Sequence, residues 1–120
     1  MAFQLRYKHG SAMSVVEVTG LAFAEQAQEV IESIQASTLE NADRRLLIDL
    51  TDVVGTLGPA DHQALGRLAA RYLSHLERVA SLVPEDKITR VSEATAQKHG
   101  LQLKVFTELT SAVAWLVAPS

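Results

Sequence analysis

The chain has 120 residues, of which 48% are hydrophobic and 21% are charged, and its net charge at pH 7 is −3. This length and composition are those of a single globular domain, which we expect to span residues 1–120. The lysines and arginines are scattered, with Arg44 and Arg45 as the only adjacent pair. Because nucleic-acid binding needs clustered cations, we expect no nucleic-acid partner. The absence of cysteine excludes disulfides, thiolate catalysis and thiolate metal sites.

Hydropathy gives a similar exclusion for membranes. No segment has the roughly 18 continuous apolar residues of a membrane span, and the first ten residues have no apolar run of signal-peptide length. We therefore expect a cytoplasmic protein without a membrane span.

The first third of the sequence predicts two strands and a helix. Apolar and polar residues alternate over Phe3–Lys8, and a turn separates this strand from a second at Met13–Thr19, so the two form an antiparallel hairpin that ends at Gly20. From Ala24 the period becomes helical, up to a polar connection at Ser37–Asp43. The apolar face of this helix contains Ala27, Val30, Ile31 and Ile34.

The middle third predicts a central strand and a helix. Leu46–Leu50 is almost continuously apolar, as in a strand that is buried on both faces. Pro59 suits the first turn of the helix that follows, which runs to about His75. Its apolar face combines larger side chains with small ones: Ala60, Ala64, Leu65, Leu68, Ala69 and Tyr72, with Gly66 and Ala70 beside them. The small residues allow either close packing on the sheet or room for an apolar ligand.

The last third predicts two strands and two helices. Arg78–Val83 is a strand, Ile88–Lys98 is a weaker helix followed by Gly100 as a left-handed cap, and Leu101–Phe106 is the fifth strand. Thr107 caps the final helix. The inward residues of this helix are Leu109, Ala112, Val113 and Leu116, and Trp115 either anchors it to the sheet or is an exposed interface residue.

The element order is therefore ββαβαβαβα, and single helices between strands imply parallel pairing with right-handed crossovers. Polar side chains on one side of several strands indicate that helices cover mainly one face of the sheet. These polar residues are Gln4, Arg6, Lys8, Glu17, Asp49, Gln102 and Lys104. We predict a two-layer α/β domain with a five-stranded mixed sheet, whose partly open face is a candidate surface for a homodimer.

Three segments carry a family resemblance. They are Leu46–Leu50 with the loop and helix after it, Glu77–Ala80, and Val105–Phe106 together with Ala112–Leu116. With them the chain resembles the SpoIIAA-like family, within the STAS superfamily of bacterial anti-sigma-factor antagonists, over nearly its whole length. The resemblance implies a βα superhelix and a protein partner. Relatives of this fold group also resemble the lipid-binding Sec14 (CRAL-TRIO) domains, which implies an alternative function as a small carrier or sensor of an apolar or anionic ligand.

One departure from the family pattern concerns regulation. In regulatory members the third strand leads into an Asp-Ser pair, and that serine is phosphorylated at the start of the next helix. The matching positions here are Leu57 and Gly58, so the resemblance implies that the phosphorylated serine is missing. Thr56 is the nearest hydroxyl and lies two residues earlier.

The loop before the helix at Pro59 is the candidate binding site, with Thr56, Gly58, Asp61 and His62 as its tentative ligand- or partner-binding residues. Backbone amides and the helix dipole converge there, as in anion sites, although the glycines are also those of a tight strand-to-helix turn, and Pro59 lacks an N–H donor. Asp61 also suits a first helical turn.

The remaining titratable residues predict no catalytic site. His9, His62, His75 and His99 lack metal-ligand spacing, and no nucleophile-elbow motif is present, so we expect no metal, no cofactor and no enzyme. Asp49 within an apolar strand is either a carboxylate with a raised pKa or one that pairs with Arg6 or Arg78 on the open face. The sequence thus favours a non-catalytic interaction or regulatory module.

Overall fold

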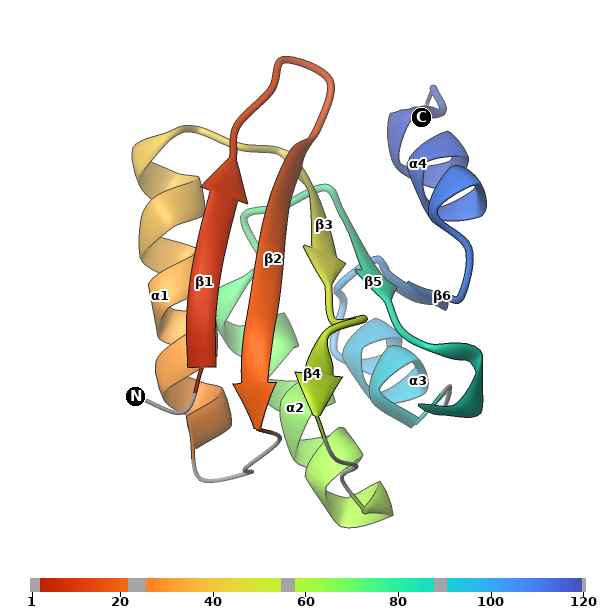
Figure 1. The fold of residues 1–120 in the computed structure, drawn as a ribbon. Helices are drawn as coiled ribbons and strands as arrows, with labels where there is room; N and C mark the ends of the chain where they lie inside the picture. Colours follow the sequence, from red (N-terminus) through yellow and green to blue (C-terminus); the bar gives the residue numbers. More distant parts are fainter. Residues whose placement is uncertain (1–2, 22–25, 55–57, 88–90, 120) are drawn as a thin grey trace.

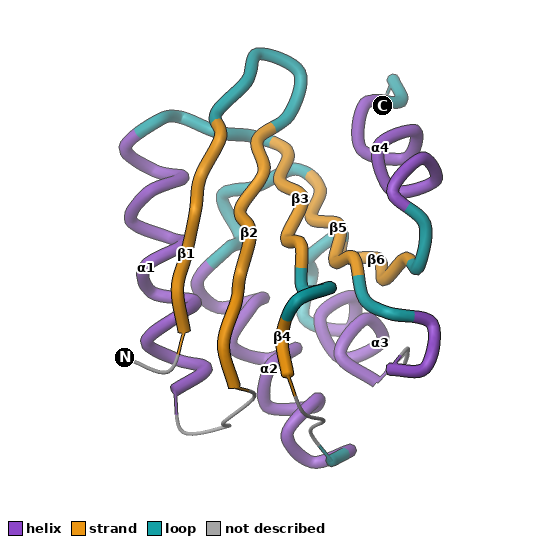
Figure 2. Tube along the Cα trace, in the orientation of Figure 1, coloured by secondary structure: helices purple, strands orange, loops and turns teal. Residues whose placement is uncertain are grey.

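The computed structural model describes residues 3–21, 26–54, 58–87 and 91–119, which form one mixed sheet and its covering helices (Figures 1 and 2). The strands are β1 (Phe3–Lys8), β2 (Ser14–Leu21), β3 (Arg45–Asp49), β4 (Val53–Val54), β5 (Arg78–Leu82) and β6 (Leu103–Phe106). The helices are α1 (Ala27–Glu40), α2 (Pro59–Tyr72), α3 (Val91–Lys98) and α4 (Leu109–Val117), with a 3-10 turn at Glu85–Lys87.

The sheet has the strand order β1-β2-β3-β5-β6, and the short β4 pairs with β2 beyond the end of β3. The hairpin β1–β2 is antiparallel, whereas every other pairing is parallel. This confirms the predicted mixed α/β sheet, to which β4 adds a sixth, two-residue strand.

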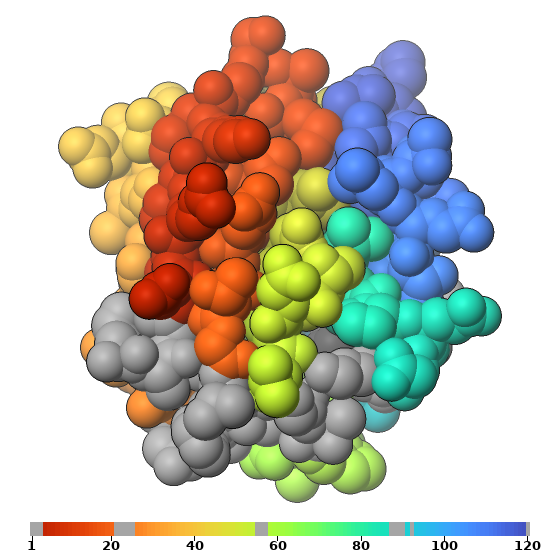
Figure 3. All heavy atoms as spheres, in the orientation of Figure 1, coloured from red at the N-terminus to blue at the C-terminus, as the bar shows by residue number. Residues whose placement is uncertain are grey.

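Two hydrophobic clusters lie on opposite faces of the sheet. Leu46 and Ile48 of β3 belong to the larger cluster, with buried residues of α1, α2 and α3. Leu47, between them, belongs to the smaller cluster with Ala112 and Leu116 of α4. Helices therefore cover mainly one face, as predicted, and α4 covers part of the other. Figure 3 shows this second face, with α4 beside the strands.

None of the described helices covers the half of the second face over β1 and β2, as Figure 1 shows. Gln4, Arg6 and Lys8 of β1 are exposed there, because Leu5 and Tyr7 between them pack on the larger cluster. Arg6 lies opposite Glu17 in the β1–β2 register, with 3.9 Å between Nη1 and Oε2. This half of the face is polar, as the alternation in the sequence indicates.

The C-terminal end of α4 is bound by two arginines that are register partners in β3 and β5. Arg45 Nη1 donates to the carbonyl oxygens of Leu116 and Ala118 at 2.8 and 2.9 Å. Arg78 Nη1 donates to the carbonyl oxygens of Trp115 and Ala118 at 2.7 and 2.9 Å. These bonds satisfy carbonyl groups that a helix end leaves without partners and place positive charge at the negative end of the helix dipole.

Strand β2 is longer than predicted. It continues through Gly20, at a φ of 130° that L side chains rarely adopt, to Leu21. The extra residues pair with β4, as Gly20 with Val53 and Leu21 with Val54. A two-residue strand has no periodicity, so its sequence predicts neither β4 nor this extension of β2.

The expected polar connection at Ser37–Asp43 is wrong in its first half, because α1 continues to Glu40. Thr38 explains the difference, since its side chain is completely buried one turn after Ile34 and its hydroxyl donates to the Ile34 carbonyl oxygen at 2.8 Å. A polar residue type thus occupies an inward helical position without an unsatisfied hydroxyl.

Other differences lie at helix ends. The N-cap of α4 is Glu108 rather than Thr107, and Leu109 is 55% exposed instead of facing inward. Ala60, in the first turn of α2, is also exposed rather than on the apolar face, and α2 ends at Tyr72, before His75. First turns project past the packed region, so helical period alone misplaces them. Gly100 has the left-handed φ that was predicted, 95°, and residues 88–90 of the predicted third helix lie outside the described residues.

Trp115 anchors α4 to the sheet. Its half-buried ring packs against the smaller cluster, 5.8 Å from the Phe106 ring and 5.6 Å from the Arg78 guanidinium carbon. We expect Trp115→Ala to lower the free energy of unfolding by about 3 kcal/mol, measured by urea and thermal unfolding. Val117→Ala, on the same helix but 42% exposed, is the control and should cost less than about 0.5 kcal/mol. Equal unfolding midpoints for the two variants would contradict the anchoring role.

Candidate functional site

The predicted site lies at the start of α2, which follows β3 and β4. Gly58 is the N-cap, with φ −78° and ψ 171°, and Pro59 occupies the first helical turn. The Asp61 Oδ2 atom accepts the Gly58 N–H at 3.4 Å, and the His62 N–H donates to the Gly58 carbonyl oxygen at 3.1 Å. The structure thus brings Gly58, Asp61 and His62 together within one turn.

The same contacts limit what this turn can bind. Asp61 places a carboxylate at the positive end of the helix dipole, the position that an anionic ligand needs. Pro59 supplies no N–H donor. The start of α2 is therefore an exposed turn in which the Asp61 carboxylate accepts the N–H of Gly58. Thr56, the fourth predicted residue, lies outside the described residues.

Asp49, at the end of β3, is half-buried and makes neither of the pairings that were expected. Its Oδ1 atom accepts the backbone N–H of Thr51 at 3.0 Å and the hydroxyl of Thr51 at 2.6 Å. Arg6 instead faces Glu17, and Arg78 binds the end of α4. Asp49 thus forms a local turn that leads out of β3, because a side chain two residues before a free N–H reaches it more easily than a distant arginine.

A polar cluster that the sequence did not predict joins the β1–β2 turn to the end of α1. The Asp43 carboxylate, 4% exposed, accepts the Ser14 hydroxyl at 2.5 Å and lies 2.7 Å from His9 Nδ1. His9 Nε2 lies 3.4 Å from the Ser37 hydroxyl, and its ring stacks on Tyr7. The available signal in the sequence was Ser14, a polar residue within an apolar strand, and the structure buries it almost fully.

The order of Ser37, His9 and Asp43 resembles the proton relay of serine hydrolases, but the surroundings do not support that chemistry. Asp43 is shared with Ser14, so it does not serve the imidazole alone. Ser37 lies in the last turn of α1, where the negative end of the helix dipole would destabilise an oxyanion. We assign the cluster to joining the hairpin to α1.

His75, between α2 and β5, extends this cluster. Its Nε2 atom lies 2.8 Å from the Thr38 hydroxyl oxygen. Because that hydroxyl donates to the Ile34 carbonyl oxygen, His75 Nε2 is the donor to Thr38. Burial lowers the pKa of His75 from its ordinary value of 6.5, and attraction to the Asp43 carboxylate offsets part of this effect.

This lowered pKa predicts a pH dependence of stability. The unfolded chain binds the His75 proton more tightly than the folded chain, so the folded state loses stability as pH falls through about 6.5 toward the folded-state pKa. We expect the urea midpoint to drop less between pH 7.5 and 5.5 in His75→Gln, whose amide can still donate to Thr38. An equal drop in the wild-type chain and His75→Gln would show that His75 does not contribute.

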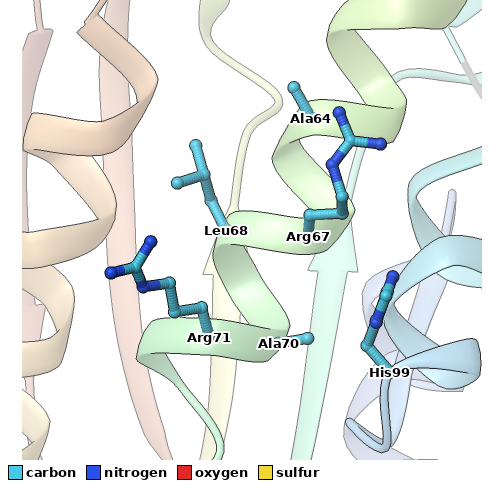
Figure 4. A pocket seen from close by; sticks show the side chains of 6 residues that line it. All are labelled: Ala64, Arg67, Leu68, Ala70, Arg71 and His99. Atoms are coloured by element: carbon cyan, nitrogen blue, oxygen red, sulfur yellow. The ribbon is translucent and has the colours of Figure 1, made fainter.

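A hollow of about 640 Å³ lies against α2 and the residue after α3 (Figure 4). Its lining consists of Ala64, Arg67, Leu68, Ala70, Arg71 and His99. From the sequence we expected the small residues of this helix to pack on the sheet or to leave room for an apolar ligand. Two of them, Ala64 and Ala70, border a surface hollow that is also lined by basic side chains. Arg67 and Arg71, four residues apart on one helix, were the signal that residue-type reasoning missed.

Within the described ranges, no group of three or more His, Cys, Asp or Glu side chains has a metal-binding arrangement. None of the helices in these ranges is both long enough and apolar enough to cross a membrane.

This fold, with three helices on one face of a mixed sheet and a fourth on the other, defines a SpoIIAA-like α/β domain. The model of the SpoIIAA-like family matches residues 13–117, so the chain belongs to that family. An anti-sigma factor antagonist from Mycobacterium paratuberculosis shares the fold, with 17% identity over 95% of this chain and 93% of that chain and a TM-score of 0.65. An uncharacterized DUF3478-family protein with a SpoIIAA-like fold from Shewanella loihica PV-4 has 16% identity over 96% and 94% of the two chains and a TM-score of 0.53. No curated protein matches the chain.

Proposed function

We propose that this protein is a non-catalytic regulatory module that acts by binding another protein. The observation that carries the proposal is its SpoIIAA-like fold, which it shares over 95% of its length with a solved anti-sigma factor antagonist. The described side chains favour the same conclusion, because their one relay-like arrangement, around Asp43, is committed to internal hydrogen bonds. Binding, rather than bond making or breaking, is the chemistry that these residues support.

The start of α2 is the proposed contact surface, formed by Gly58, Asp61 and His62; Thr56, the fourth residue of the predicted site, lies outside the described residues. Gly58, Pro59 and Ala60 are exposed, and Asp61 and His62 are half-buried. Val54 of β4, shortly before this turn in the chain, is 60% exposed and adds apolar area. A small exposed turn with one carboxylate, one imidazole and an apolar neighbour combines the polar and apolar contacts of a protein interface.

We also propose that two copies of the chain form a homodimer through the free half of the sheet face. Arg6, Lys8 and Glu17 line that half, so a second copy would be held by complementary ion pairs more than by apolar area.

We further propose that phosphorylation at the start of α2 does not control binding, because Gly58 stands where the family resemblance implies a serine. Gly58→Ser should fold normally, since a Cβ there would lie 4.0 Å from Asp61 Oδ2 and the φ of −78° suits any residue. A serine N-cap should raise the free energy of unfolding by a few tenths of a kcal/mol, measured with urea.

Intact mass of the wild-type protein from its own cells should show no phosphate, and a stoichiometric phosphate on Thr56 would overturn the proposal.

The contact surface can be tested by site-specific photo-crosslinking in the cells that make the protein. We expect a crosslinker at His62 to capture one defined protein, and a crosslinker at exposed Glu32 of α1 to capture none. The purified partner should then bind His62→Ala about tenfold more weakly than wild type and bind Glu32→Ala unchanged. Equal capture from both positions, or unchanged affinity of His62→Ala, would contradict this surface.

A further inference from the structure

The described arginines divide into two groups according to their partners. Four of them contact oxygen atoms of the protein: Arg6 with Glu17, Arg44 and Arg45 with Glu77, and Arg78 with the carbonyl groups at the end of α4. In the part of the chain that the structure describes, Arg67 and Arg71 have no carboxylate or carbonyl partner. The Arg71 guanidinium carbon lies 5.5 Å from the centroid of the Tyr72 ring, a contact that leaves its N–H donors free.

These two arginines, both exposed, line the hollow of about 640 Å³ on α2 together with His99 (Figure 4). Among the residues that the structure describes, no acidic side chain lines it, and the rest of the lining is apolar. Figure 4 shows Arg67 and His99 toward one flank of α2, and Leu68 and Arg71 toward the other. The volume lies within the range of about 300–1,000 Å³ that is usual for small-molecule sites.

We propose that this hollow is a binding site for a small phosphate monoester with an apolar substituent. The protein has a net charge of −3, so two neighbouring guanidinium groups without acidic partners form a local positive charge on a protein that is negative as a whole. The two side chains extend toward opposite flanks of α2 (Figure 4), but residues four apart lie one turn apart on a helix, so these two long, exposed side chains can turn toward one ligand. This proposal does not rest on the proposed protein-binding function.

The chemistry of the lining selects this ligand class. Guanidinium groups donate paired N–H bonds that match the oxygen geometry of a phosphate, and they are less strongly hydrated than ammonium groups. Two such charges neutralise a phosphate dianion, whereas a carboxylate needs one. The apolar side chains of Ala64, Leu68 and Ala70 leave space and area for a ring or short acyl chain.

Two sources could supply this chemistry, a soluble phosphate ester or the headgroup of a lipid such as phosphatidic acid. The soluble probe is phenyl phosphate, titrated into the full-length 15N-labelled chain. We expect saturable chemical-shift changes in residues 64–71 and at His99, and weaker binding of the monoanion benzoate. The lipid probe is co-sedimentation with phosphatidylcholine vesicles that contain phosphatidic acid, against vesicles of phosphatidylcholine alone.

Two variants and a charge-matched control decide whether the hollow is responsible. Arg67→Gln with Arg71→Gln should weaken phenyl phosphate binding at least about tenfold, because both charged donors are lost. Ala64→Leu, which fills the hollow without a change in charge, should weaken it at least about threefold. Arg44→Gln with Lys104→Gln removes the same charge from other surfaces and should leave binding unchanged.

Each outcome has a definite meaning. Saturable binding of phenyl phosphate that both hollow variants weaken supports a soluble ester, and selective vesicle binding that they weaken supports a lipid source. The proposal is overturned if neither probe binds, or if the control pair loses as much affinity as the Arg67 and Arg71 pair. Loss of protein binding at the start of α2 would leave this result unaffected, so the two proposals fail separately.

Discussion

Burial of the central strands on both faces is the constraint on which the rest of this structure depends. Leu46 and Val79 are fully buried toward α1, α2 and α3, and Leu47 and Ala80, the next residues of β3 and β5, are buried toward α4. The strand order β1-β2-β3-β5-β6 advances across the sheet in one direction. Crossovers of one hand between strands that advance in one direction all lie on the same face, so α1, α2 and α3 must share it. No crossover to a further strand constrains α4 within the described residues, so it is free to cover the other face.

The arginines of β3 and β5 complete this arrangement. Arg45 and Arg78 are register partners, and both donate to carbonyl groups at the end of α4. Apolar contacts of a nine-residue helix are not directional, whereas these hydrogen bonds fix where the helix ends. Because α4 is held over β3, β5 and β6, the polar half of the face over β1 and β2 stays free for contacts with other molecules.

The fold could largely be predicted from sequence, because it depends on period and on backbone-restricted residues. The alternation over Phe3–Lys8 gave β1 its bounds, and Gly100 marked the turn before β6. The errors arose where the partner of a side chain decides the structure. Thr38 appeared as part of a polar connection, although its hydroxyl is satisfied within α1, and β4 forms only because β2 is beside it.

The candidate site was less predictable for the same reason. Gly58, Asp61 and His62 lie together at the start of α2, as their spacing in the sequence implies. Residue types could not show that the Asp61 carboxylate accepts the Gly58 N–H, nor that Asp43 joins His9 to Ser14 across the fold. The sequence shows even less about whether an arginine lacks a carboxylate or carbonyl partner. From residue types alone, Arg67 and Arg71 cannot be distinguished from other arginines on the exposed face of a helix.

Helix α2 thus carries two different kinds of surface along its length. Its start is an exposed turn whose positive dipole is already matched by Asp61, and its second half carries Arg67 and Arg71 without acidic partners. The hollow begins at Ala64, three residues after Asp61 and a rise of about 4.5 Å, and it extends to Arg71, ten residues after Asp61 and a rise of about 15 Å. Its nearer end lies within the Debye length of about 8 Å at physiological ionic strength, so charge bound at that end acts directly on the start of the helix. Buried contacts of Ala69 and Ala70 hold α2 against the sheet, so this electrostatic effect, rather than movement of α2, would couple the two surfaces.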